Sequence, residues 1–90
     1  MRESEIEKQL VAHVESLGGL ALKVSVANAR GFPDRLILLP NGRAFFCELK
    51  KEDGGTTSPQ QLSWMNRLWL LGYRVRICYG LHDAIKFLKE

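Results

Sequence analysis

The chain of 90 residues is poor in the side chains that build zinc sites or disulfide frameworks. It has only two cysteines, Cys47 and Cys78, with no CxxC pair and no cluster of cysteine with histidine. A structural zinc ion or a disulfide framework is therefore not expected. Both cysteines lie inside apolar runs, so we predict buried free thiols in a reducing compartment.

Long apolar runs are also absent. None approaches the roughly 20 residues that cross a bilayer, and the segment from Met1 to Glu5 is too acidic and polar for a secretory leader. We therefore expect a soluble, intracellular, cytoplasmic protein without a membrane partner, for which a viral or bacterial source is reasonable.

The composition is that of a small folded protein. Hydrophobic residues make up 46% and charged residues 26%, and neither repeats nor low-complexity tracts occur. This length predicts one domain over residues 1–90 with one small core. Thirteen Lys and Arg against ten Asp and Glu give a net charge of +3. A polyanionic partner is compatible with that charge, although charge alone does not establish one.

Apolar spacing, caps and turns predict seven elements. The expected helices cover Ser4–Leu17, Ser58–Leu71 and Leu81–Leu88, and the expected strands cover Ala21–Val26, Arg35–Leu39, Arg43–Lys50 and Tyr73–Tyr79. The order α-β-β-β-α-β-α predicts an α/β fold, in which a mixed four-stranded sheet is flanked by helices. The last two strands are expected to be parallel through a right-handed crossover.

The central hairpin brings acids together. A loop of Pro40-Asn41-Gly42 pairs Leu39 with Arg43, which places Asp34 opposite Glu48. Strand alternation puts Lys50 on the same face as Glu48. Two carboxylates so close repel each other unless a cation lies between them, and hard oxygen ligands suit Mg²⁺ or Mn²⁺. A register slip of one residue would move Asp34 to the far face.

The first helix carries two more candidate acids. Glu7 and Glu3 fall within its apolar arc, where a carboxylate is costly without a charged partner. Alternatively, Ser4 and Glu7 form a capping box, in which Glu7 folds back onto the backbone of Ser4.

The second helix also contains a polar residue that could either cap the helix or lie on its apolar face. Gln61 could close a capping box with Ser58, yet it lies inside a wide apolar arc. That arc exceeds the stripe needed to pack on one sheet, which favours a homodimer through Trp64, Leu68 and Leu71.

These residues together resemble a known nuclease signature. Gly31-Phe32-Pro33-Asp34 followed by Glu48-Leu49-Lys50 resembles the PD-(D/E)xK motif. The glutamate of the first helix and the Ser58-Pro59-Gln60-Gln61 helix resemble the virus-type replication-repair nuclease (VRR-NUC) branch. The resemblance extends from Glu3 to Leu88 and implies a restriction-endonuclease-like core.

The resemblance also implies roles for individual residues. Asp34, Glu48 and the Leu49 carbonyl would hold the metal, with Glu7 touching it directly or through water. Lys50 would orient the attacking water, and Gln61 would help to hold the site. Glu3 remains an alternative to Glu7.

Together these features predict a Mg²⁺- or Mn²⁺-dependent DNA endonuclease that acts as a homodimer on structured DNA such as a four-way junction, with no small-molecule cofactor. The candidate DNA contacts are Lys23, Arg30, Arg35 and Lys51. Two alternatives stay open: a DNA-binding module of the same fold without catalysis, and a plain oligomerisation domain.

Overall fold

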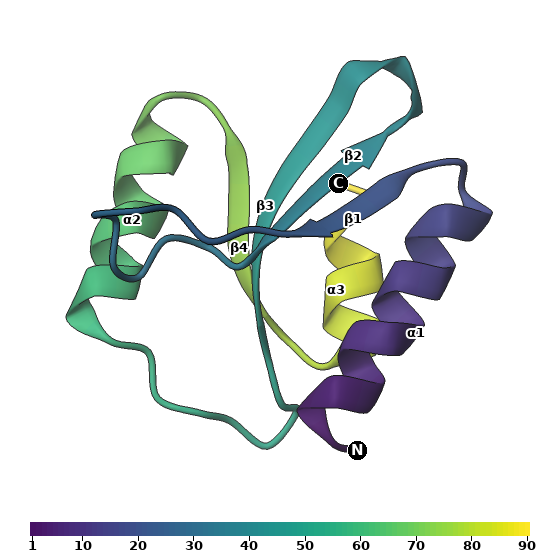
Figure 1. The fold of residues 1–90 in the computed structure, drawn as a ribbon, viewed down its shortest axis with the longest axis horizontal. Coiled ribbons are helices and arrows are strands. Elements are labelled where there is room, and N and C mark those ends of the chain that lie inside the picture. The colour runs from purple at the N-terminus through teal and green to yellow at the C-terminus, as the bar shows by residue number, and fades with distance from the viewer.

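The computed structural model describes all residues from 1 to 90 and shows three helices around one sheet (Figure 1). The helices are α1 (Glu3–Ser16), α2 (Pro59–Leu70) and α3 (Leu81–Phe87), and the strands are β1 (Leu20–Lys23), β2 (Arg35–Leu39), β3 (Arg43–Lys50) and β4 (Arg74–Tyr79), with a short 3₁₀ turn at Pro40–Gly42. The predicted mixed α/β fold and element order are confirmed. None of the helices has the length and apolar character needed to cross a bilayer.

The strands lie in the order β1-β2-β3-β4. The first two pairs are antiparallel, whereas β3 and β4 are parallel, as expected. Leu39 pairs with Arg43 across the tight turn, and the pairing continues to Arg35 opposite Cys47. Positive φ angles at Asn41 and Gly42 close this turn. The hairpin register predicted from the sequence is therefore confirmed.

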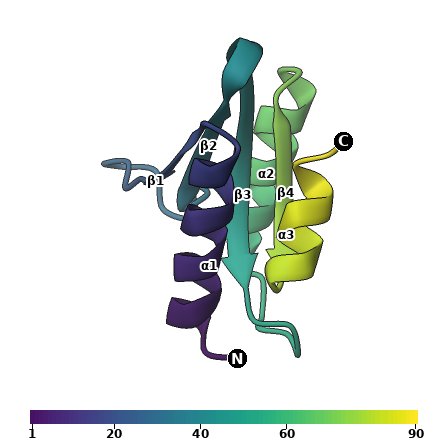
Figure 2. The ribbon, with the colours of Figure 1, turned by 90° about the vertical axis from the view of Figure 1, so that its right-hand side faces the viewer.

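The core lies on one face of the sheet, beneath α1 and α3 (Figure 2). Alternate residues of β3 point into it: Phe45, Cys47 and Leu49 are fully buried. From the helices, Ile6 of α1 and Phe87 of α3 meet them. Cys78 joins this cluster, and both cysteines are buried and free. The predicted buried thiols are therefore confirmed.

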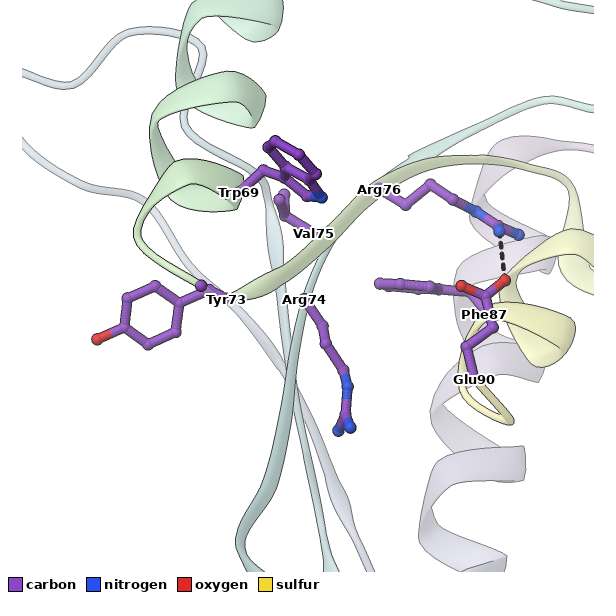
Figure 3. A pocket seen from close by; sticks show the side chains of 8 residues that line it. Trp69, Tyr73, Arg74, Val75, Arg76, Phe87 and Glu90 are labelled. Carbon is purple, nitrogen blue, oxygen red and sulfur yellow. Dashed lines mark hydrogen bonds and ion pairs between the residues drawn. The ribbon is translucent and has the colours of Figure 1, made fainter.

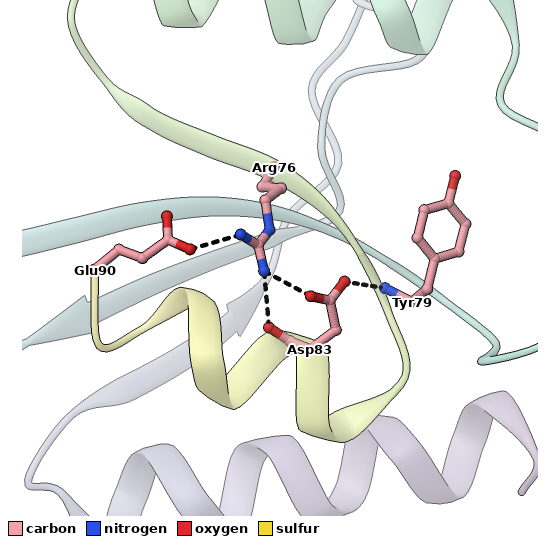
Figure 4. A network of polar contacts seen from close by, with 4 residues as sticks. All are labelled: Arg76, Tyr79, Asp83 and Glu90. Carbon is pink, nitrogen blue, oxygen red and sulfur yellow. Dashed lines mark hydrogen bonds and ion pairs between the residues drawn. The ribbon is translucent and has the colours of Figure 1, made fainter.

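Ion pairs attach α3 to the edge strand β4 (Figure 4). The Arg76 guanidinium donates to Asp83 and Glu90 at 2.6 Å each, and the second carboxylate oxygen of Asp83 accepts the Tyr79 N–H at 2.9 Å. Arg76 also lies over the Phe87 ring, 5.1 Å from its centroid. Arg76 is thereby engaged within the protein.

The opposite face is covered by α2 and by the segment before β2 (Figures 1 and 2). Phe32 of that segment makes edge-on contacts with Phe46 of β3 and with Trp64 of α2, at centroid distances of 5.8 and 5.2 Å. The Trp64 indole N–H also donates to the Arg30 carbonyl at 3.0 Å. These contacts fix the segment that leads to Asp34.

Two local expectations are wrong. The strand predicted over 21–26 ends at Lys23, and its faces are reversed: Ala21 packs on the core while Leu22 is exposed. The sequence shows that the strand has two different faces, but it does not show which face packs against the helices. The first helix ends at Ser16, one residue earlier than expected, and Leu17 is exposed because Gly18 and Gly19 turn the chain towards β1.

Candidate active site

The site begins at the carboxyl end of β3, where charged side chains stand on the face away from the core. Since Arg35 pairs with Cys47, the next positions outward on the two strands, Asp34 and Glu48, oppose each other. The Lys50 Nζ lies 3.8 Å from a Glu48 carboxylate oxygen, and both side chains are largely buried. The acid pair and the lysine predicted from the hairpin register therefore come together.

Burial and mutual repulsion perturb these acids. Burial, reinforced by the charge of Asp34, raises the pKa of Glu48 to about 7, although the Lys50 ammonium opposes the shift. Burial also raises the pKa of Asp34, against a hydrogen bond from the Leu49 N–H and the charge of Arg35. A divalent cation bound between the two carboxylates would relieve their mutual repulsion and favour their ionised forms.

Backbone packing holds Asp34 in place. Gly31 has φ +88°, and a Cβ there would lie 2.7 Å from the Gln60 carbonyl carbon, so only glycine lets the chain pass this close to α2. Pro33 is fully buried. Behind Asp34, the Leu49 N–H points to its carboxylate at 3.5 Å. The Gly-Phe-Pro-Asp motif thus serves to anchor the acid.

Glu7 is held by basic groups. One carboxylate oxygen lies 3.5 Å from the Arg35 guanidinium and 3.9 Å from the Lys23 ammonium. The alternative capping box with Ser4 is wrong, because α1 begins at Glu3 and its N-cap, Arg2, makes no side-chain bond. Glu7 therefore meets charged partners, as a carboxylate facing the core requires.

Arg35 is the site residue whose surroundings the sequence reasoning missed. It is only 7% exposed, donates to the Ala21 carbonyl at 3.3 Å, and leaves its Nε without a partner. Its expected role as a surface contact to DNA does not fit this burial, and it acts instead as the partner of Glu7. The signal was present in the alternation, because Arg35 shares its face with the apolar Ile37 and Leu39.

The choice between Glu3 and Glu7 as third acid stays open. The charge of Glu7 contributes to the raised pKa of Asp34, after burial, whereas the charge of Glu3 contributes to that of Glu48. No three Asp, Glu, His or Cys side chains surround a common point. The structure therefore brings together two acidic groups and a lysine, and leaves the acids of α1 at the border of the site.

Gln61 closes a capping box at the start of α2. The Ser58 hydroxyl accepts the Gln61 N–H at 3.1 Å, and the Gln61 side-chain oxygen accepts the Ser58 N–H at 3.0 Å. This alternative from the sequence is confirmed. The side-chain NH₂ of Gln61 makes no hydrogen bond within the protein, so only that group is free for the site.

The remaining predicted residues divide between surface and interior. Lys23, Arg30 and Lys51 are exposed, as contacts to DNA require. Of the expected dimer contacts, Leu71 is 72% exposed, but Leu68 is 7% exposed and packs within the chain.

The apolar arc of α2 is therefore partly used inside the molecule, which corrects the proposed contact set. Trp64 packs on Phe32 and beneath the Arg67 guanidinium, 4.0 Å from the ring centroid. The apolar side chains that α2 leaves exposed are Leu62, Trp69, Leu70 and Leu71.

Both the sequence and the fold were compared with those of known proteins. No family profile matches the chain. A protein of Acyrthosiphon pisum secondary endosymbiont phage 1, named "Putative nuclease p44", is 45% identical over 75 residues, which cover 83% of this chain and 80% of that protein. A solved structure described as a VRR_NUC domain superposes with a TM-score of 0.87 at 31% identity, over 98% of this chain and 95% of the other.

A second solved structure, described as a VRR_NUC domain protein, has a TM-score of 0.77 at 14% identity, over 99% of this chain and 86% of the other, and supports the fold. The fold and the motifs around Asp34, Glu48 and Lys50 define a protein of the PD-(D/E)xK nuclease superfamily. Within it, the chain belongs to the VRR-NUC family.

Proposed function

We propose that this protein is a metal-dependent endonuclease that hydrolyses phosphodiester bonds of structured DNA. The observation that carries the proposal is the meeting of Asp34 and Glu48 across the hairpin, with the Lys50 ammonium 3.8 Å from Glu48. A protein that only binds DNA gains nothing from two acids beside the phosphates. The family membership and the phage relative's name support the same reaction class.

The residues fit a hard divalent cation such as Mg²⁺ or Mn²⁺. Asp34 and Glu48 offer carboxylate oxygens, and the Leu49 carbonyl, between Glu48 and Lys50, would complete the set. The raised pKa of Glu48, due to burial and to Asp34, supports this assignment because a cation would relieve both effects. Such an ion supplies Lewis acidity to the phosphate and lowers the pKa of its water.

The side chains around the acid pair would have different roles in the cleavage reaction. The Lys50 ammonium would orient the attacking water and offset the negative charge that develops on the phosphate. Glu7, or Glu3 one turn earlier, would touch the cation directly or through water. The free NH₂ group of Gln61 would help to hold the site from α2. Exposed Lys23, Arg30 and Lys51 would contact phosphates of the DNA.

The favoured substrate is a branched duplex, cut by a homodimer. Two copies related by a two-fold axis would present two sites to the two strands of a symmetric four-way junction. The exposed apolar side chains Trp69, Leu70 and Leu71 at the end of α2 support self-association.

A cleavage assay tests the proposal. An end-labelled four-way junction and a linear duplex with one arm's sequence are incubated with Mn²⁺, with Mn²⁺ plus excess chelator, and with the Asp34→Asn variant. We expect wild-type protein to cut the junction faster than the duplex, and the chelator and the variant to abolish cutting. A junction that is retarded in a gel but stays intact would identify a DNA-binding module without catalysis.

A further inference from the structure

Two arginines at the far end of the sheet lie outside the candidate active site. Arg43 begins β3, five residues or about 17 Å along the strand from Glu48, and Arg74 begins β4 opposite Phe45. Both arginines share the face of Phe45, whereas Glu48 and Lys50 lie on the other face of the sheet. Both line a groove of about 340 Å³ between the turn at Gly42 and the turn at Gly72. Neither position belongs to the acid pair or its supporting segment.

The two guanidinium groups lie against the same aromatic ring. The Cζ atoms of Arg43 and Arg74 lie 5.4 and 5.3 Å from the Phe45 centroid. Phe45 is fully buried and packs edge-on against Phe87. Both cations therefore lie within cation–π distance of one fixed ring.

No carboxylate compensates either charge. Neither arginine takes part in any ion pair of the structure, and the one hydrogen bond of Arg43 goes to the Leu88 carbonyl at 2.7 Å. The nearby carboxylate of Glu90 is engaged by Arg76, and Figure 3 shows it beside Arg76 and away from the Arg74 guanidinium. Two guanidinium groups that line one groove without an acid favour an anion, and a phosphate matches their planar donors.

We infer that Arg43 and Arg74 form a second phosphate-binding site, which holds the nucleic-acid backbone at the end of the sheet away from the acid pair. The inference rests on the proposed nuclease function, which supplies the polyanion. It adds a contact that orients a long substrate on the protein. Such a site raises affinity without taking part in the cleavage step.

The test compares variants that each remove one positive charge. Arg74→Gln removes the exposed member of the pair, whereas Lys86→Gln removes an exposed lysine of α3 that forms no ion pair. Affinity for a labelled four-way junction is measured by fluorescence anisotropy in a chelator, at several salt concentrations. For each variant we also measure thermal unfolding, and the cleavage rate with Mn²⁺ at a saturating concentration of junction.

We expect Arg74→Gln to weaken binding about five- to tenfold and to reduce the salt slope by about 1. Lys86→Gln and Arg74→Lys should keep the wild-type slope, and all variants should cut at the wild-type rate once saturated. Equal affinity and slope for Arg74→Gln and Lys86→Gln would overturn the second site while leaving the nuclease proposal intact. A wild-type protein that binds no DNA at all would overturn both.

Discussion

Asp34 and Glu48 lie opposite each other one position beyond Arg35 and Cys47, the last pair of the β2–β3 ladder. Burial and the charge of Asp34 raise the pKa of Glu48 to about 7, from an ordinary value of 4.5. The folded state is therefore less stable when Glu48 carries neither a proton nor a nearby cation.

The stability of the metal-free protein should fall as the pH rises through 7. Because the pKa of the Glu48 carboxyl is higher in the folded than in the unfolded chain, the folded state binds its proton more tightly. The associated stability is complete below about pH 4.5 and is lost as the pH approaches and passes 7. Thermal unfolding in a chelator should show a lower Tm at pH 8 than at pH 6. Glu48→Gln should flatten this difference and raise the Tm at pH 8, whereas identical profiles would contradict the assignment.

Removal of Glu48 should weaken cation binding. Titration of Mn²⁺ by calorimetry at pH 8 should give an affinity more than about tenfold lower for Glu48→Ala than for wild type. Glu15→Ala, an exposed acid in the last turn of α1, is the matched control and should bind as wild type does. Wild-type affinity should itself fall towards pH 6, because protons then compete for Glu48. Equal binding by Glu48→Ala and wild type would refute the metal site.

Loss of Glu7 should destabilise the protein through Arg35. Glu7→Gln leaves a guanidinium that is 7% exposed without its carboxylate, which should cost about 1–3 kcal/mol in the free energy of unfolding. A urea-unfolding cycle with Arg35→Met and the double variant measures the coupling, for which we expect about 1 kcal/mol or more. Strictly additive losses would show that the two side chains do not stabilise each other.

The two roles of Gln61 can be separated by two substitutions. Gln61→Ala removes the capping box and should lower the free energy of unfolding by about 1 kcal/mol, while Gln61→Glu retains a cap acceptor and should unfold like wild type. If the NH₂ group also holds the active site, Gln61→Glu should cut DNA more slowly at unchanged stability. Wild-type stability of Gln61→Ala would contradict the capping role.

Self-association should depend on the exposed end of α2. In sedimentation velocity we expect a wild-type dimer and a Leu71→Glu monomer that keeps the wild-type circular dichroism spectrum, because Leu71 is 72% exposed and supports nothing within the chain. Leu62→Glu, near the start of the same helix and 55% exposed, is the control and should remain dimeric. A monomeric wild-type protein would remove the dimer from the proposed function.

The sequence predicted the parts of the fold that local rules determine. Turn chemistry at Pro40–Gly42 set the hairpin register, and that register alone brought Asp34 opposite Glu48. The faces of β1 were predicted wrongly, because alternation shows two sides without showing which one α1 covers. The shared contact of Arg43 and Arg74 with Phe45 depends on the register of β4 against β3, which the predicted parallel crossover does not specify.

The close passage of Gly31 over the first turn of α2 has a mechanical consequence. With no side chain between the backbone at Gly31 and that of Gln60, the two segments have no slack to slide independently. Since only Phe32 and the fully buried Pro33 separate Gly31 from Asp34, we expect a tilt of α2 to shift Asp34 as well. The position of α2 and the separation of Asp34 from Glu48 are thus expected to change together.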